Sequence, residues 1–280
     1  MSQENSSRAV QSLWIGNSLS LMEVASIRSF LRYQYEYRLY VFDEPKNVPA
    51  GTTLLDARAV LPKEKSFYQL GDVQRGGGSV TAFSNIFRWL LLYEHGGAWV
   101  DTDLILLRPL NLDAPCMIAT EARKDVEKGR WSRMKKRISG ILRRSDRSQA
   151  NNCFIKIAPK SELMRRCVEY CASREPAQWA DAPFGTTGVK LIQRLVREMQ
   201  LESCLLPVHY ICPIDHWDAE SFHRRRPRPR RAYAVHLWNE MWRRNNWDKN
   251  RFEPGSLYDL LTEHVPDRIE FARASAASHC

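Results

Sequence analysis

Apolar residues in the first 42 positions form two short runs separated by an amphipathic stretch. Val10–Ile15 has the length and composition of a buried strand, and Gly16 after it marks a turn. Leu19–Leu31 fits a helix, and Leu39–Phe42 is a second apolar run of strand length. Because the order strand, helix, strand favours a parallel sheet, this pattern predicts an α/β domain.

Helical periodicity returns at Thr81 and stops where Gly96 and Gly97 interrupt it. The apolar positions that define this helix are Phe83, Ile86, Phe87, Leu90 and Leu91. Two short apolar runs follow, Ala98–Val100 and Leu104–Leu107, and both are predicted as strands. The acidic residues between these two runs therefore lie where a strand ends.

The second half of the chain continues the α/β pattern. Asn152–Ile157 and Ala232–Leu237 are predicted as strands, and Ser161–Ala172 and Val189–Met199 as helices, the first of them capped by Ser161. We therefore expect a mostly parallel sheet flanked by helices.

The length of 280 residues suits a single domain, and an apolar content of 44% is enough for a buried core. We place this domain at residues 1–272 and expect a frayed tail at residues 273–280. No stretch approaches the roughly 18 apolar residues that span a bilayer, and the amino-terminal residues lack the apolar core of a secretory signal. The chain is therefore expected to be soluble and cytoplasmic.

The seven cysteines are scattered and form no Cys-x-x-Cys pair of the kind that binds zinc or does redox work. Cys167 and Cys171 can share a helix face, but no second pair of ligands accompanies them. Reduced thiols are the simplest expectation.

The net charge of +10 is concentrated in two segments. Residues 123–147 hold eleven basic and three acidic residues, and the loop 223–231 holds six arginines, two prolines and no acid. The remainder of the chain is mildly acidic, and no nucleic-acid-binding module is visible, so nucleic acid is not the expected partner.

Segment 123–147 is predicted as a basic helical insertion with an apolar stripe. The stripe consists of Trp131, Met134, Ile138, Ile141 and Leu142. This combination is typical of a helix that lies on an anionic lipid surface, although a basic helix packed on its own domain has the same pattern. Segment 223–231 is predicted as an extended, mobile Arg/Pro loop.

Asp101 and Asp103 are the residues that suggest chemistry. They follow a strand, at the carboxyl edge where an open α/β sheet places its ligands. Two carboxylates can hold Mg²⁺ or Mn²⁺ and bridge it to a diphosphate, whose developing charge the metal neutralises. An Asp-x-Asp triplet is a weak signal alone, but these acids stand between apolar runs, where unpartnered acids are seldom found.

The surrounding sequence resembles a known enzyme group. The run SNIFRW at Ser84–Trp89, the run YEHGGAWVDTD at Tyr93–Asp103 and the opening LWIG at Leu13–Gly16 are similar to the sugar-binding region of DXD-containing glycosyltransferases. This group includes glycosyltransferase family 32 and the catalytic domains of the large clostridial glucosylating toxins. The resemblance covers roughly the first 110 residues well and implies a GT-A fold, a nucleotide-sugar donor, Mn²⁺ or Mg²⁺, and retention of anomeric configuration.

The resemblance also implies roles for individual residues. Asp101 would contact the donor sugar or ribose, Asp103 would ligate the metal, and Arg88 would reach the sugar or diphosphate with its guanidinium fork. Trp14 would cover the base. The family usually has Asp where this chain has Asn85, which keeps an acceptor for sugar hydroxyls but loses the charge.

His236 is the expected third metal ligand, because it follows a strand and resembles the family's carboxy-terminal His-x-Trp element. Trp238 in that element is predicted to be a lid or core aromatic group, and the run GTTG at residues 185–188 resembles a donor- or acceptor-facing turn, or a plain helix cap. The predicted metal ligands are Asp103, Asp101 and His236. The predicted substrate-binding residues are Trp14, Ile15, Gly16, Ser84, Asn85, Arg88, Gly97, Asp101, Thr102, Asn152, Gly185, Thr187, Gly188 and Trp238.

The expected function is transfer of a hexose or N-acetylhexosamine, with a UDP-sugar as the favoured donor and a cell-surface glycan or lipid-linked saccharide as acceptor. The acceptor hydroxyl would attack the face that the diphosphate leaves, so the protein mainly positions groups and stabilises charge. The enzyme would then be cytoplasmic and peripheral on the inner face of the plasma membrane. The alternatives are a protein-glycosylating effector, a catalytically dead sugar-binding homologue, and a basic nucleic-acid-binding protein.

Overall fold

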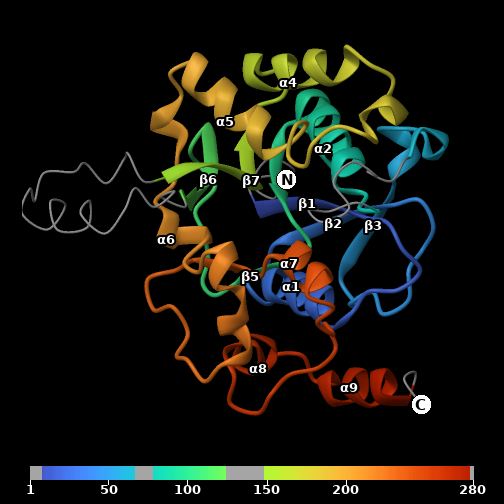
Figure 1. The fold of residues 1–280 in the computed structure, drawn as a ribbon, viewed down its shortest axis with the longest axis vertical. Coiled ribbons are helices and arrows are strands. Elements are labelled where there is room, and N and C mark those ends of the chain that lie inside the picture. The colour runs from blue at the N-terminus through green and yellow to red at the C-terminus, as the bar shows by residue number, and fades with distance from the viewer. Residues whose placement is uncertain (1–7, 67–77, 124–147, 278–280) are drawn as a thin grey trace, which may run out of the picture.

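A six-stranded sheet forms the centre of the chain (Figure 1). The computed structural model describes residues 8–66, 78–123 and 148–277. The predicted basic helix therefore lies, apart from Arg123, outside the described residues. The strands, in sheet order, are β3 (Thr52–Asp56), β2 (Glu36–Val41), β1 (Ala9–Trp14), β4 (Gly97–Val100), β7 (Ser148–Ile157) and β6 (Cys116–Ala122).

The sheet is mostly parallel. β2 pairs in parallel with β1 and β3, and β1 with β4, whereas β7 runs antiparallel to both β4 and β6. With helices on both faces, this confirms the predicted α/β class, a mostly parallel sheet flanked by helices. β1, the helix α1 (Leu21–Arg32) and β2 also confirm the predicted opening order.

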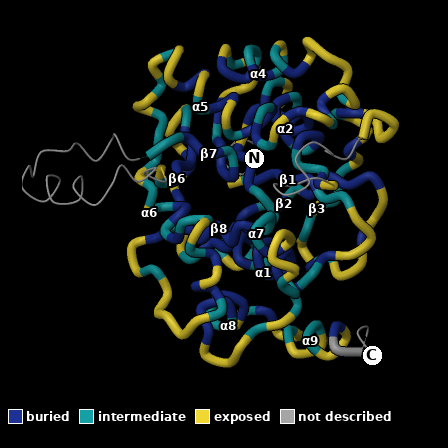
Figure 2. The backbone as a smooth tube through the Cα atoms, in the orientation of Figure 1, coloured by how far each residue is buried: buried dark blue, intermediate teal, exposed yellow. Residues whose placement is uncertain are grey.

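The helices cover the sheet in two layers, which lie above and below it in Figure 1, and Figure 2 shows the buried strands between them. The upper layer contains α2 (Thr81–His95), α4 (Glu162–Ala172) and α5 (Val189–Glu198). The lower layer contains α1, α7 (Asn239–Arg244), α8 (Leu257–Thr262) and a two-stranded sheet of β5 (Leu104–Leu106) and β8 (Ala234–His236).

Alternating strand residues supply the two cores. In β4, Ala98 and Val100 pack in the lower core, whereas Trp99 packs in the upper core with residues of α2. α2 ends at Gly96, whose φ of 61° and close approach to Pro159 exclude a side chain there, because an added Cβ would lie 2.4 Å from the Pro159 nitrogen. This stop turns the chain directly into β4 and so sets the position of the acids that follow.

Further elements complete the described part of the chain. Its remaining helices are α6 (Val208–Ile211) and α9 (Arg268–Ala277), and its 3₁₀ turns are η2 (Ala57–Ala59), η3 (Lys63–Lys65), η6 (Pro176–Trp179), η7 (Glu202–Cys204) and η8 (His216–His223). The prediction of a frayed tail from residue 273 is wrong as far as residue 277, because α9 continues to Ala277. None of the helices in the described part of the chain has the length and apolar character needed to cross a membrane.

Within the predicted Arg/Pro loop 223–231, His223 is the last residue of η8, and residues 224–231 contain no helix or strand. Its arginines nevertheless make ion pairs with acids of neighbouring elements. Arg224 pairs with Glu220 at 2.7 Å, Arg226 with Asp218 at 2.9 Å, and Arg228 with Glu263 at 2.6 Å. These ion pairs neutralise part of the segment's positive charge within the domain. This weakens the alternative that the segment is a nucleic-acid-binding surface.

Candidate functional site

The pairing of β5 with β8 brings His236 to the two aspartates. Leu104 lies opposite His236 in this antiparallel ladder, and the Leu237 backbone nitrogen donates to the Asp103 carbonyl oxygen at 2.9 Å. Asp101 is fixed at the end of β4 because its backbone nitrogen donates to the Cys153 carbonyl on β7, at 2.8 Å. His236 and the two aspartates, more than 130 positions apart along the chain, thus lie together at the carboxyl edge of the sheet.

The side chains of Asp101, Asp103 and His236 form a compact group whose ligand atoms all lie within 4.8 Å of one another. Asp103 is 5% exposed, and its Oδ2 accepts a hydrogen bond from the Asn239 backbone nitrogen at 2.7 Å and lies 3.3 Å from Nε2 of His236. Carboxylate oxygens are the ligands that Mn²⁺ and Mg²⁺ prefer, and an imidazole nitrogen is a common ligand of transition metals, so the donor set fits a divalent cation.

The charges of Asp103 and His236 depend on one another. Burial favours the neutral form of each group, but the opposite charge of its partner outweighs burial. The pKa of Asp103 is therefore lowered below 3.8, and the pKa of His236 is raised well above 6.5. In the absence of metal the two side chains form a buried ion pair near neutral pH.

This ion pair predicts a pH-dependent stability of the metal-free protein. A raised pKa in the folded state adds stability that is fully present below the unfolded value of 6.5 and is lost as the pH rises through the folded value. With EDTA present, the His236→Gln variant should therefore lose more unfolding free energy, relative to wild type, at about pH 6 than at about pH 9. Urea denaturation at both pH values measures this difference.

The same comparison in an Asp103→Asn background is the control. Without the carboxylate, the His236→Gln effect should no longer vary in this way with pH. A wild-type dependence that survives the loss of Asp103 would contradict the assignment of the raised pKa to this pair.

Arg88 on α2 is the buried cation of the site. It is 4% exposed, and its guanidinium donates to Asp101 Oδ1 at 2.6 Å and to Asn85 Oδ1 at 2.8 Å. The guanidinium carbon lies 4.6 Å from the Trp99 ring centroid, and the indole nitrogen of Trp99 also donates to Asp101 Oδ1, at 2.7 Å. Burial lowers the pKa of Arg88 against the opposing effect of Asp101. The fork therefore orients Asp101 from the α2 side of the sheet.

Asn85 forms hydrogen bonds within the protein, and its predicted contact with sugar hydroxyls stays a prediction. Its side chain is 2% exposed, and Oδ1 accepts from Arg88 and, at 2.8 Å, from the amide of Asn152. Its own amide faces Thr187 Oγ1 at 3.5 Å, and a Cβ at Gly188 would lie only 2.3 Å from that amide nitrogen. Asn85 and Asn152 thus hold Arg88 in place, and this geometry assigns them positioning roles.

The turn at residues 185–188 packs α5 against α2. The Gly188 nitrogen donates to the Gly185 carbonyl at 3.1 Å, the Thr186 nitrogen donates to Pro183, and the Thr187 carbonyl accepts from the Trp89 indole at 2.7 Å. The Thr186 and Gly188 amides therefore form hydrogen bonds within the turn. Thr187 and Gly188 contact the Asn85 side chain, whereas Gly185 faces Val189 and Lys190.

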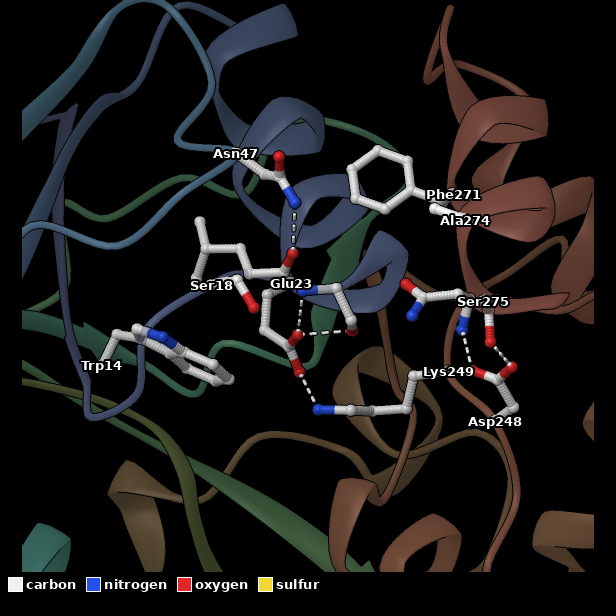
Figure 3. A pocket seen from close by; sticks show the side chains of 12 residues that line it. Trp14, Ser18, Glu23, Asn47, Asp248, Lys249, Phe271, Ala274 and Ser275 are labelled. Carbon is white, nitrogen blue, oxygen red and sulfur yellow. Dashed lines mark hydrogen bonds and ion pairs between the residues drawn. The ribbon is translucent and has the colours of Figure 1, made fainter. Parts of the chain in front are cut away.

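Trp14 ends β1 beside a cavity of about 510 Å³ (Figure 3). Its indole nitrogen is buried and has no hydrogen-bond partner among the described residues, and the Lys249 ammonium lies 5.5 Å from the ring centroid. Lys249 also pairs with the fully buried Glu23 at 2.7 Å. Gly16 lies against the Trp14 ring. The cavity is lined by Trp14, Ser18, Leu19, Ser20, Glu23, Asn47, Asp248, Lys249, Asn250, Phe271, Ala274 and Ser275.

The other predicted substrate-binding residues differ in how near they lie to Asp101 and Asp103. Thr102 is in the turn between Asp101 and Asp103, and Ile15 packs at the border of the upper core. Ser84 is half-buried on α2. Gly97 is the first residue of β4, at the opposite end of that strand from Asp101, and an added Cβ there would lie 2.8 Å from the Gln11 amide. The predicted role of Gly97 is therefore not supported, because its position serves the packing of β4 on β1.

Trp238 packs on His236, with ring centroids 4.0 Å apart, and its indole donates to the Ile214 carbonyl at 2.8 Å. It is 8% exposed, which agrees with a core aromatic group. Two contacts in the site were not expected from sequence, namely the Trp99 indole and the Asn239 backbone nitrogen. The signal for Trp99 was its spacing of two from Asp101, which puts both on one face of an extended strand.

Comparison with known proteins agrees with this geometry. Residues 22–123 match the family model described as "glycosyltransferase sugar-binding region containing DXD motif", and Asp101-Thr102-Asp103 lies inside the match. No protein with curated annotation matches the chain.

Two solved structures are similar at low identity. A structure titled "PaToxG glycosyltransferase" is 11% identical, with 70% of this chain and 69% of that chain covered and a TM-score of 0.41. The ligand-free glycosyltransferase domain from the YGT toxin is 9% identical, with 71% and 79% covered and a TM-score of 0.39. On the family match over residues 22–123, this chain carries a DXD-motif glycosyltransferase sugar-binding region and is a glycosyltransferase.

Proposed function

We propose that the protein transfers a hexose or N-acetylhexosamine from a nucleotide-sugar, a UDP-sugar in the first instance, with Mn²⁺ or Mg²⁺ as cofactor. The observation that carries this proposal is that Asp101 and Asp103, inside the matched region 22–123, have ligand atoms within 4.8 Å of one another and of His236, which lies outside that region. Arg88 beside Asp101 supplies a fixed donor fork of the kind that binds phosphate or sugar oxygens.

Charge balance makes the proposed donor site dependent on metal. In the metal-free protein Arg88 pairs with Asp101 and protonated His236 pairs with Asp103, so the site has a net charge of about 0 and attracts a diphosphate only weakly. A divalent cation that displaces the His236 proton changes this balance to about +1. When bound, the cation would bridge the carboxylates to the diphosphate and act as a Lewis acid on the leaving group.

The protein's own groups hold this arrangement. The Asn239 backbone nitrogen orients Asp103, the Trp99 indole and Arg88 orient Asp101, and Trp238 packs on His236. Because these partners are buried, the carboxylates need little reorganisation when donor binds, and this preorganisation favours the transition state.

The nucleoside would bind on the Trp14 side of the same edge. β1 and β4 are adjacent parallel strands, so Trp14 and Asp101 follow strand ends that point the same way. The Ser12 hydroxyl donates to the Val100 carbonyl at 2.5 Å and ties these two ends together. An aromatic ring facing a cavity of about 510 Å³ suits stacking on a planar base, with the diphosphate reaching toward Asp101.

Thermal unfolding with nucleotide tests the proposal. UDP together with Mn²⁺, each in about 100-fold excess over its dissociation constant, should stabilise the protein by about 3 kcal/mol and raise Tm by roughly 5–10 °C. UDP with EDTA should give little change, and GDP is the matched nucleotide control. Stabilisation by UDP that does not depend on metal, or stabilisation only by polyanions, would contradict the proposal.

The acceptor is a further part of the proposal. A cell-surface glycan or lipid-linked saccharide and peripheral attachment to the inner face of the plasma membrane rest on segment 123–147, nearly all of which lies outside the described residues. Retention of anomeric configuration rests on the resemblance. An active enzyme is favoured over a dead homologue because Asn85 still accepts the hydrogen bonds from Arg88 and Asn152 that position the site.

A further inference from the structure

Two buried thiols lie behind His236, on the side away from Asp103. Cys153 is on β7 and Cys212 directly follows α6, and their side chains are 0% and 1% exposed. The two sulfur atoms are 3.8 Å apart, and the Cys212 sulfur is 3.9 Å from Nδ1 of His236. One ligand atom from each of these three residues lies within 4.8 Å of the other two.

The sulfur–sulfur separation matches an edge of a tetrahedral thiolate site, and the separation of the Cys212 sulfur from Nδ1 is a few tenths of an ångström longer than such an edge. With a Zn–S bond of about 2.3 Å and a tetrahedral angle, two ligand sulfurs lie roughly 3.8 Å apart, and a sulfur and an imidazole nitrogen lie only slightly closer. The backbone on each side is held in place, because the Cys153 carbonyl accepts from Asp101 and the Cys212 nitrogen donates to Val208 at 2.9 Å. The ligand atoms are therefore placed for a cation without rearrangement of the strands.

The imidazole has the orientation that such a site requires. A histidine that binds zinc through one nitrogen usually donates its other ring N–H to a carboxylate, which fixes the tautomer. Here Nδ1 faces the thiols and Nε2 lies 3.3 Å from Asp103 Oδ2. The His236 ring thus lies between the Asp103 carboxylate on one side and the thiols of Cys153 and Cys212 on the other.

We propose that Cys153, Cys212 and Nδ1 of His236 bind a thiophilic divalent cation, Zn²⁺ in the first instance, at a second site distinct from the proposed donor-binding cation. Zn²⁺ displaces the two thiol protons to solvent, and the two thiolates then cancel its charge, which makes a buried position acceptable. Bound zinc would keep the proton of His236 on Nε2, so the imidazole would orient Asp103 as a hydrogen-bond donor. With zinc bound, His236 would support the donor-site cation through Asp103 and would not ligate it, and that cation would be held by Asp101, Asp103 and substrate oxygens.

Cobalt substitution tests this site without nucleotide. The full-length, reduced, chelator-treated protein is titrated with Co²⁺, and thiolate-to-cobalt charge-transfer absorption is followed in the near ultraviolet. We expect the absorption to saturate at one equivalent, to disappear on addition of Zn²⁺ and to persist with excess Mn²⁺. Cobalt bound by Asp101 and Asp103 has no thiolate ligand and gives no such absorption, so failure of the zinc site and failure of the proposed function are distinguishable.

Serine variants locate the ligands. Cys153→Ser and Cys212→Ser should each weaken the cobalt absorption at least tenfold at equal metal, whereas Cys167→Ser, which removes an equally buried thiol on α4, should leave it unchanged. Circular dichroism checks that each variant is folded. Absorption that persists in both Cys153→Ser and Cys212→Ser overturns the proposal, and so does its absence from the folded wild-type protein, an outcome that requires no variant.

Discussion

Replacing Asp103 with asparagine is expected to reduce metal-dependent donor turnover by roughly 10²–10³-fold while the fold is retained. Asparagine has nearly the same shape, and its Oδ1 can still accept from the Asn239 backbone nitrogen. It removes the negative charge that holds the cation and leaves His236 without its ion-pair partner. The substitution therefore acts on the cation and the diphosphate, and only weakly on the buried hydrogen bonds.

Donor hydrolysis and Mn²⁺-dependent UDP affinity measure this effect. The matched control is Asp181→Asn, because Asp181 is an exposed acid outside the site and its replacement changes the net charge by the same amount. Wild type and Asp181→Asn should agree within about twofold, whereas Asp103→Asn should lose most of the Mn²⁺-dependent affinity. Equal Mn²⁺-dependent affinity in the two variants would contradict a role for Asp103 as metal ligand.

Long periodic segments were predictable from sequence, and short or edge segments were not. The helix that begins at Thr81 is located correctly, because its apolar positions repeat over four turns. β3 was missed because it is an edge strand with half-buried and exposed residues, so no apolar run marks it. α6, α7 and α8 contain four to six residues each, too few for a helical period to appear.

The candidate site also contains residues that were predictable from sequence and residues that were not. The structure brings Asp101, Asp103 and His236 together as the sequence predicts, because the acids follow a strand and the resemblance supplies the histidine. The group of His236 with Cys153 and Cys212 was not predictable, since its members come from three separate elements and share no local spacing. Sequence motifs reveal ligands that are close along the chain, whereas tertiary pairing decides which distant residues join them.

The position of Asn85 illustrates a different limit. A motif aligns residues by type, so the sequence predicts a sugar contact for a residue that the family usually has as Asp. In the structure the Asn85 side chain is buried, and its oxygen accepts hydrogen bonds from Arg88 and Asn152. The amide can fill this role without a charge, and an aspartate there would place a second carboxylate on Arg88. The substitution therefore changes the charge around Arg88 more than it changes any hydrogen-bond acceptor.

The pairing of Arg88 with Asp101 leads to the second large expected effect, on stability and activity together. Arg88→Met should lower the free energy of unfolding by about 3 kcal/mol, because it removes one partner of a buried ion pair and a donor to Asn85. Asp101→Asn should cost a comparable amount, because it leaves the Arg88 guanidinium, which is 5% exposed, without its counter-ion, although the new amide oxygen still accepts from the Trp99 indole. Urea denaturation followed by tryptophan fluorescence measures both values.

The double variant distinguishes a role in stability from a role in the reaction. When Arg88→Met and Asp101→Asn are combined, neither side chain leaves an unpaired charge, so the loss of stability should be smaller than the sum of the single losses by about 1–2 kcal/mol. Donor turnover should stay at least roughly 10²-fold below wild type in all three variants, because both the fork and the carboxylate are absent from the double variant. Arg165→Met, which breaks an exposed pair with Glu162 on α4, is the control and should change neither property noticeably. Additive stability losses would show that Arg88 and Asp101 do not act as a pair, and recovery of turnover in the double variant would show that the pair serves the fold alone.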